Sequence, residues 1–571
     1  MLESATSKLT LRPDILALKN GLLEGSASWY AAILAGKVKG DWAHLLLQAG
    51  TYARSLFAAT DHRTFVPILA LCHLTSEFRL LFYHRSGMLA THAMNLKTEA
   101  GFRDLVSTIV GVWLWRAPFQ AGYESTQTPK YFSFNDIKYH IHSVVCRRQA
   151  IRGRTTTVYA VKRSEVPDGQ SRYFATPRVD CGGREWMCLN PFDLVVKPTE
   201  PYNGEESMET QSLPVDLPDS FIVKCSYQPR IRDSEVNVFS AVQGYIGIQD
   251  IIAEYEAVNF SIPDDKIVTP WRPTYRGDSV PVNESDEDHN DLVSLPYESR
   301  VHRHLIIRTV GMHLTKDLTF RQVGLAMLHA LIGHCALFTQ GGYLHRDVSN
   351  GNILVLSEPQ QFRRIPPILD GIITVDICNA VLIDGDIATK WGTRANASDR
   401  LGTLPFVSAR LLNLWLDGEA ITHTPIDDLE SFAWVLLYNA LAWTPAKSRS
   451  RSEIRWWNNL DDKNLEHLSN YKTLAIAVHW ADTMEHDQLK ISGIVQPFAS
   501  LLYQWFRTTK KYCRSLSRYE KEHRGSDEFS KLFTDAYQEL VRVVKDECDK
   551  LPDTLIDTVV LLKEKNTTTL R

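Results

Sequence analysis

The residues from His345 to Asn352 have the types and spacing that phosphoryl transfer needs. In this stretch, HRDVSNGN, Asp347 precedes Asn352 by five positions. A carboxylate can accept the proton of an attacking hydroxyl, and an amide oxygen is a hard ligand suited to Mg²⁺. A helical apolar pattern precedes the stretch, and the strand-like run Ile353-Leu354-Val355 follows it. A His-Arg-Asp triplet alone arises by chance, but this spacing in this context predicts a phosphotransfer site.

A second magnesium ligand is expected on a loop beyond Asn352. The run Val381-Leu382-Ile383 is typical of a strand and delivers Asp384 at its end. Asp370 and Asp376 are nearer to Asn352 and compete for the role, but Asp370 lacks an apolar strand of the same quality before it. We therefore predict that Asn352 and Asp384 bind the metal ion; the alternative is that Asp384 is an ordinary turn residue.

The phosphates also need a lysine on a strand and an acidic residue on the next helix to hold it. Lys162 follows Tyr-Ala-Val but lies only nine residues after Gly153, too close for a third strand. Lys197 runs into a Pro-rich segment. Lys224 follows Phe-Ile-Val and is itself followed by a helical pattern that contains Glu235. We predict that Lys224 contacts the phosphates and that Glu235 is its partner.

Two further features complete the predicted site. Gly153 can form a turn that covers the phosphates, with Val158 packing on the nucleotide base, although an ordinary hairpin turn would have the same sequence. Asp427-Asp428 opens an intensely apolar helix, where an aspartate can cap the helix and brace the backbone of the catalytic loop. His334 and His423 show no metal-ligand spacing, so we interpret both as structural histidines.

Composition sets the frame for these motifs. The chain has 571 residues, 44% of them apolar, and a net charge of −4, which gives no global electrostatic argument for nucleic-acid binding. Nine scattered cysteines without a Cys-x-x-Cys motif predict a reduced intracellular protein, cytoplasmic or nuclear. The longest apolar run, Phe432–Trp443, is too short to span a bilayer, so no membrane partner is expected.

Hydrophobic periodicity predicts the order of the elements. Residues 1–60 fit helical spacing, 65–69 and 78–82 are strand-like with a hairpin turn at 84–87, and residues 102–117 fit a helix. Residues 139–228 contain four strand-like runs, with a Pro-rich insertion at 199–220. The acidic segment 276–292 lacks the glycine and glutamate of an EF-hand loop, so we interpret it as solvated. Helices dominate from Phe320 onward, and 503–565 is helical with a basic section, interpreted as a solvated face; a partner or nucleic-acid contact is the alternative.

Taken together, these residues resemble the fungal-type protein kinase family. The matching pieces are Ile151–Thr155, Val223-Lys224 with Ser234-Glu235, His345–Asn352, Leu382–Ala388, Gly402–Phe406, Asp428–Ser431 and an amino-terminal segment around Tyr52–Arg54 and His84–Leu89. The resemblance covers roughly residues 40–480. It implies a bilobal α+β kinase fold, ATP and Mg²⁺ as cofactors, and transfer of the γ-phosphate to a protein hydroxyl. We predict serine/threonine specificity.

The predicted organisation has four parts. Residues 1–125 form an α+β amino-terminal extension, 126–300 a strand-rich small lobe with polar insertions, 301–505 a helical large lobe and 506–571 a helical tail. The substrate proteins are not identified by the sequence.

Three departures from the usual kinase pattern leave alternatives open. Ser349 stands where many kinases have a lysine, although serine is common in this family. Gly385 replaces the aromatic residue that usually follows the metal-binding aspartate and sets the position of its loop. The phosphate turn has a single glycine. A pseudokinase or scaffold that binds nucleotide weakly is therefore one alternative. A small-molecule kinase of the aminoglycoside or choline type is the other, disfavoured by Gly402–Phe406 and Asp427–Ser431, which resemble a protein-kinase activation segment and its anchoring helix.

Overall fold

The structure is a computed structural model. It describes residues 2–3, 10–11, 13–18, 32–59, 63, 65–84, 87–115, 131–134, 137–147, 156–163, 217–256, 300–361, 363–392, 402–418, 422–462, 464–479, 493–522 and 525–558. The predicted turn glycine Gly153, the competing Lys197, the strand-like run 192–196 and the acidic segment 276–292 lie outside these residues.

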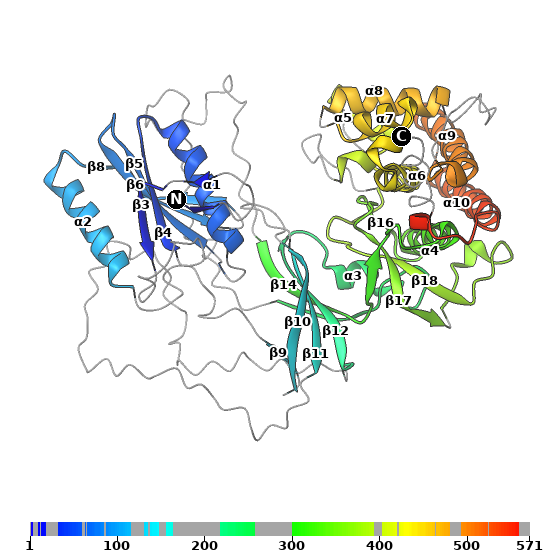
Figure 1. Ribbon diagram of the computed structural model, residues 1–571, viewed down its shortest axis with the longest axis horizontal. Coiled ribbons are helices and arrows are strands. Elements are labelled where there is room, and N and C mark those ends of the chain that lie inside the picture. Colours follow the sequence, from blue (N-terminus) through cyan, green and yellow to red (C-terminus); the bar gives the residue numbers. More distant parts are fainter. Residues whose placement is uncertain are drawn as a thin grey trace, which may run out of the picture. The chain divides into compact units, whose positions relative to one another are not determined.

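The chain divides into two compact units. The first, here called the sheet unit, comprises Met1–Ile231 and Ala253–Ile306. The second, the helical unit, comprises Arg232–Ile252 and Ile307–Arg571. The protein is therefore of the mixed α+β class, with a strand-rich amino-terminal part and a helical carboxy-terminal part, as predicted (Figure 1).

The amino-terminal part of the sheet unit is a six-stranded sheet with a helix on each face. Its strands follow the order β3-β4-β5-β6-β7, and β8 pairs with β6. The parallel pair β4–β5 is joined by α1, whereas the other pairs are antiparallel. One apolar cluster packs α1 on the sheet and another packs α2 on the opposite face (Figure 1). The elements are β3 (Ile15–Leu18), β4 (Ala32–Lys39), α1 (Trp42–Ala59), β5 (Phe65–Cys72), β6 (Glu77–His84), β7 (Gly87–Ala90), β8 (Met94–Asn95) and α2 (Glu99–Trp113), preceded by the short pair β1 (Leu2–Glu3) and β2 (Thr10–Leu11).

A second six-stranded sheet carries the predicted phosphate-contacting residues. Its strand order is β13-β14-β12-β11-β10-β9, and β9 to β12 form an antiparallel meander. Aromatic side chains of β9, β10, β11 and β12 pack on one another inside it, among them Phe134, Tyr139 and Phe221. The strands are β9 (Tyr131–Phe134), β10 (Ile137–Arg147), β11 (Thr157–Arg163), β12 (Ser220–Pro229), β13 (Ile251–Glu256) and β14 (Arg300–Ile307).

The helical unit is built around α6, which is buried along nearly its whole length. The helix α4 packs against α6 and α10, and α9 packs against both α6 and α10. Its helices are α3 (Glu235–Ser240), α4 (Phe320–Thr339), α5 (Ala409–Asp417), α6 (Pro425–Trp443), α7 (Arg451–Leu460), α8 (Leu465–Leu474), α9 (Ala499–Lys521) and α10 (Ser526–Cys548). Two small antiparallel ladders join β15 (Gly311–His313), β17 (Ile353–Gln361) and β18 (Ile377–Leu382), and β16 (Tyr343–Leu344) with β19 (Thr389–Lys390).

Among the described residues, α4 is the one helix long and apolar enough to cross a membrane by length and composition. Of its most apolar window, 78% is buried inside the protein. A buried core helix of a soluble protein passes the same test, and the packing of α4 against α6, α10 and β18 is that of a core helix.

The prediction that residues 1–60 are helical is wrong over much of its length. Residues 15–18 and 32–39 form strands β3 and β4, and only 42–59 form a helix. The strand β4 is covered on both faces, so its apolar residues run continuously and do not alternate, and periodicity cannot separate such a run from a helix. The predicted strands at 65–69 and 78–82, the helix near 102–117, three of the four runs in 139–228 and the helices after Phe320 are confirmed.

Candidate active site

The predicted catalytic loop leaves β16 at His345 and enters β17 at Ile353, and its central carboxylate, that of Asp347, is held by hydrogen bonds. Asp347 is 5% exposed. Its Oδ1 accepts hydrogen bonds from the backbone N–H of Thr403 at 3.0 Å and the hydroxyl of Thr403 at 2.8 Å. The Asn352 amide Nδ2 donates to the backbone oxygen of Asp347 at 2.8 Å and to its Oδ2 at 3.3 Å. The amide nitrogen of Asn352 therefore faces Asp347, which leaves its oxygen on the other side as a possible metal ligand.

The backbone of this loop is anchored by one aspartate of α6. Asp428 Oδ2 accepts from the backbone N–H groups of His345 at 3.1 Å and of Arg346 at 3.2 Å. Arg346 has a φ of 67°, in the left-handed region that side chains rarely adopt, so the anchor holds a strained turn. The prediction that an aspartate of this helix braces the catalytic loop is confirmed.

His345 ties the catalytic loop to the strand that leads to Asp384. Its Nδ1 accepts from the Asp347 backbone N–H at 3.3 Å, and its Nε2 lies 2.9 Å from the backbone oxygen of Ile383. Because Nδ1 accepts, Nε2 must carry the proton and donate it to Ile383. Burial lowers the pKa of His345 although the nearby Asp428 acts to raise it, which agrees with a neutral ring.

The structure favours Asp384 over its two competitors. In the ladder of β17 and β18, Ile353 faces Leu382, and the Ile383 N–H donates to the backbone oxygen of Asn352 at 2.9 Å. Asp384 thus follows directly at the Asn352 end of this strand pair. Asp370 and Asp376 are exposed and lie in the connection at the opposite end. Asp384 has a φ of 70°, a second strained position beside the catalytic loop.

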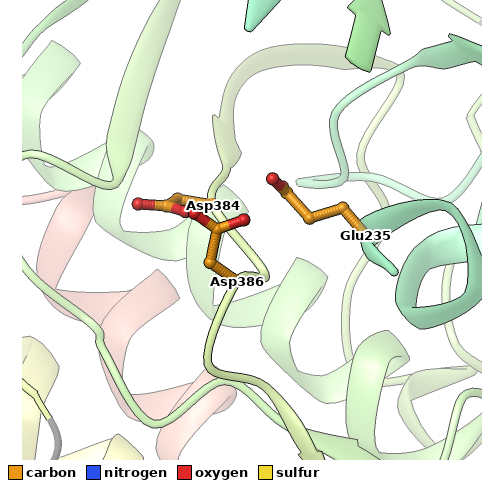
Figure 2. A group of neighbouring side chains, drawn as sticks. All are labelled: Glu235, Asp384 and Asp386. Carbon is orange, nitrogen blue, oxygen red and sulfur yellow. The ribbon is translucent and has the colours of Figure 1, made fainter. Parts of the chain in front are cut away.

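Three carboxylates gather at the loop that follows β18. One oxygen each from Glu235, Asp384 and Asp386 lies within 4.8 Å of the others, with Glu235 reaching in from α3 (Figure 2). Glu235 and Asp386 are buried. Glu235 Oε2 accepts from the backbone N–H of Gly385 at 3.1 Å and from the side chain of Gln249 at 3.4 Å. Like charges this close are mutually unfavourable, and a divalent cation with hard oxygen ligands would offset the repulsion.

The predicted phosphate-contacting residues lie in the second sheet of the sheet unit. Lys224 on β12 is buried, and it stands directly opposite Val158 on β11. Paired residues in an antiparallel ladder point to the same face, so Lys224 and Val158 share one side of the sheet. Lys162 is exposed near the end of β11, as expected for a surface lysine. Glu235 belongs to the helical unit, so its ion pair with Lys224 stays a prediction.

Two contributors were missed by the sequence reasoning. Asp386 lies two residues after Asp384, and this spacing could have indicated a role for it at the metal site. Thr403 lies in the stretch Gly402–Phe406, and nothing in the sequence indicates that it hydrogen-bonds to Asp347 across 56 residues. Gly402 permits this approach, because it has a φ of 108° and an added Cβ would lie 3.1 Å from the Arg346 backbone oxygen. His334 and His423 are structural, as predicted, since both hydrogen-bond to Asp428.

Comparison with known proteins identifies the family of the chain. The chain belongs to the fungal protein kinase family, whose sequence model matches residues 26–173 and 188–440. A search of the curated proteins found no match. Among solved structures, the chain is similar to one described as the structure of vaccinia related kinase 3, with 11% identity, a TM-score of 0.31, and coverage of 70% of this chain and 94% of that chain. The family match makes the protein a protein kinase in general terms and implies a nucleotide and a divalent metal. The three carboxylates of Glu235, Asp384 and Asp386 offer only hard oxygen atoms, which suit such a metal.

Proposed function

We propose that the protein is an ATP-dependent serine/threonine protein kinase that uses Mg²⁺. In this proposal Asp347 orients the attacking hydroxyl and accepts its proton as the γ-phosphoryl group passes from ATP to the hydroxyl oxygen, with ADP leaving. Asn352 and Asp384 would hold the metal, and Lys224, paired with Glu235, would hold the phosphates under the turn at Gly153, with Val158 against the base. A bound metal supplies charge neutralisation on the phosphates.

The observation that carries the proposal is the pair of hydrogen bonds from Thr403 to Asp347 Oδ1. They bring the segment 402–407 to the edge of the catalytic carboxylate. A hydroxyl accepted by Asp347 must therefore lie beside this segment. A serine or threonine places its own backbone close enough to pack there, whereas a tyrosine would hold the peptide away by the length of its ring. The contact also supports a protein substrate over a small molecule.

We infer a bilobal arrangement with the four predicted parts: 1–125 as the amino-terminal extension, 126–300 as the small lobe, 301–505 as the large lobe and 506–571 as the tail. Protein substrates are the proposed partners, and the proposed location is inside the cell. These points follow from the family resemblance and from the motifs.

The test is phosphotransfer by the purified full chain, with γ-labelled ATP, Mg²⁺ and a mixed-sequence peptide library, followed by identification of the phosphorylated residue type. We expect phosphoserine or phosphothreonine. Asp347→Asn should lower transfer by about 10²–10⁴-fold while nucleotide binding persists, because it removes the acceptor of the proton and little packing. Asp384→Asn should instead weaken Mg²⁺-dependent nucleotide binding.

Asp370→Asn is the matched control, because Asp370 is exposed and remote from Asn352. Asp370→Asn should leave both phosphotransfer and Mg²⁺-dependent nucleotide binding unchanged. Transfer that survives Asp347→Asn would remove that residue from the mechanism, and equal effects at 370 and 384 would refute the choice of metal loop. Phosphotyrosine as the main product would overturn the proposed specificity.

A further inference from the structure

The loop between Asp384 and Asp386 has a glycine where kinases usually place an aromatic residue, and the space beside that glycine is filled. A Cβ added to Gly385 would lie 2.7 Å from Cε2 and 3.4 Å from Cζ of Phe239, and 3.2 Å from Cγ1 of Val238. Atoms that close must move, and here the nearest atoms belong to a rigid ring. The missing side chain at residue 385 has therefore left no cavity, because a ring from α3 occupies the position next to the loop.

Phe239 packs between the predicted metal loop and two other elements, α4 and β16. It is completely buried in a cluster with Ala336 and Leu337 of α4, Tyr343 of β16 and Ala388, which follows the loop. Residue 385 itself is fixed on both sides of its backbone: its N–H donates to Glu235 Oε2 at 3.1 Å, and its oxygen accepts from the Ala388 N–H at 2.9 Å. The ring thus packs against the one backbone segment that carries both Asp384 and Asp386.

The helix that carries Phe239 is fixed within the helical unit. At its start, the Tyr343 hydroxyl donates to Asp233 at 2.9 Å. Beyond its end, the Ile246 N–H donates to the Arg364 oxygen at 2.9 Å and the Leu382 N–H donates to the Gly247 oxygen at 2.8 Å. Because this helix is held in place, the ring of Phe239 can restrict the position of the loop against which it packs.

We propose that Phe239 is a positioning residue for the metal-binding loop, and that Phe239 and Gly385 form a matched pair. The aromatic contact that normally comes from the loop is supplied by the helix, and the glycine makes room for it while its N–H reaches Glu235. The pair holds the carboxylates of Asp384 and Asp386 at the metal position. This inference rests on the proposed function, since it takes Asp384 to be a metal ligand.

A double-mutant cycle tests the pair. Gly385→Phe places a second ring in space that Phe239 already occupies, and Phe239→Ala removes the ring that packs against the loop. Each alone should lower phosphotransfer by roughly 10-fold or more and raise the Mg²⁺ concentration for half-maximal activity. The combined Phe239→Ala/Gly385→Phe chain should recover much of the activity and a near-normal Mg²⁺ requirement, because the new ring can occupy the vacated space. The milder pair Phe239→Leu and Gly385→Ala repeats the test if a larger change prevents folding.

Val242→Ala is the control for a purely structural effect. Val242 is fully buried in the same cluster but is not among the nearest atoms to residue 385. Its truncation should lower the unfolding midpoint without shifting the Mg²⁺ requirement, and Gly385→Phe should not rescue it. Independent, additive losses in the combined Phe239/Gly385 chain would overturn the proposal.

The test also separates this inference from the proposed function. If the parent chain transfers no phosphate, the cycle is measured by Mn²⁺ affinity and by the unfolding midpoint. Non-additive effects of the two substitutions on both Mn²⁺ affinity and the unfolding midpoint would then support the pairing of Phe239 with Gly385, although the kinase proposal had failed. Phosphotransfer that depends on Asp347, without coupling between residues 239 and 385, would leave the kinase proposal intact and refute the pair.

Discussion

Asp428 and Glu430 are buried carboxyl groups two residues apart on α6, and their pKa values shift in opposite directions. Asp428 accepts hydrogen bonds on both oxygens, from the backbone N–H groups of the catalytic loop and from His334 on Oδ2, and from His423 on Oδ1. Burial raises its pKa, but the two histidines outweigh burial and hold the pKa well below its usual range. Asp428 is therefore an anion in the core, stabilised by the donors around it.

Glu430 is equally buried but has fewer donors. Both of its hydrogen bonds, from the Ala409 N–H and from the Trp434 indole, fall on Oε1 at 2.8 Å. Burial raises its pKa, and these bonds together with the nearby Lys472 only partly offset the effect. The comparison shows that the number and placement of donors, and not burial alone, decide the charge of a buried carboxyl group.

The two groups also anchor different parts of the site. Asp428 holds residues 345–346 of the catalytic loop. Glu430 holds the start of α5, directly after the segment that contacts Asp347. Lys472 on α8 completes this second anchor: its ammonium is fully buried and donates to the backbone oxygens of Pro405 at 2.8 Å and Val407 at 2.6 Å. One helix thus anchors residues 345–346 and the start of α5 by separate means, which in the proposed function are the catalytic and the substrate sides of the site.

Replacing each of the two carboxyl groups, Asp428 and Glu430, by its amide should give the largest difference in stability and activity. Asp428→Asn places an NH₂ group where an oxygen now accepts, so a donor faces a donor in the core. We expect a loss of about 3–5 kcal/mol in the free energy of unfolding, since one partner of a buried ionic cluster is removed. Displacement of the catalytic loop should lower phosphotransfer by about 10²-fold. Urea unfolding and activity per folded molecule measure both.

Glu430→Gln is the matched partner of that experiment. Its remaining oxygen can keep both hydrogen bonds of Oε1, so we expect a cost below about 1 kcal/mol. Equal costs for the two replacements would show that the two carboxyl groups carry the same charge and would break the comparison.

Lys472→Met should have an intermediate effect that falls on the substrate side. It leaves the oxygens of Pro405 and Val407 without their donor, which should cost about 1–3 kcal/mol of stability. Because these oxygens flank the segment beside Asp347, the KM for a peptide should rise more than the KM for ATP. The exposed Lys447 provides the control, and Lys447→Met should change neither quantity. A rise confined to the KM for ATP would contradict the assignment of this segment to the substrate.

The sequence was informative where a function requires fixed spacing along the chain. Asp347, Asn352 and Asp384 lie at the two strand ends that their spacing predicted, and the bracing aspartate of α6 was foreseen because it follows a helix start. All of these sit within short motifs flanked by strongly apolar elements. Their metal-binding and catalytic roles stay predictions, as does the contact of Lys224 with the phosphates.

The sequence could not reveal contacts between residues far apart along the chain. Lys472 lies in a largely polar helix, and its partners are 65 and 67 residues away. The meeting of Glu235 with Asp384 and Asp386 depends on the placement of α3 against the loop after β18, which no periodicity encodes. Phe239 and Gly385 are a further example. In the sequence, Gly385 indicates only that the usual aromatic residue is missing, whereas the structure shows that the ring of Phe239 lies beside it.

The smallest expected effect is a pH dependence that comes from Lys472. Burial lowers its pKa from an ordinary value of 10.5 to about 7, although Glu430 acts to raise it, and the ammonium lies 4.6 Å from the Trp434 ring. A neutral amine keeps two N–H donors, enough for both carbonyl oxygens, so losing the proton does not break the anchor.

The sign of this dependence follows from proton binding. Between pH 7 and 10.5 the unfolded chain binds a proton at Lys472 that the folded chain does not, so stability should rise with pH in this window and level off below it. The slope is at most about 1.4 kcal/mol per pH unit. Glu430 faces this lysine, and its raised pKa gives the opposite slope at lower pH, so the comparison should be made in the Glu430→Gln background. In that background, the unfolding free energy of the chain with Lys472 should exceed that of the Lys472→Met chain by a larger amount at pH 8.5 than at pH 7. We expect this difference to increase by on the order of 1 kcal/mol. Parallel curves would mean that the lysine stays charged in the core, and that the substrate-side anchor is as ionic as the one at Asp428.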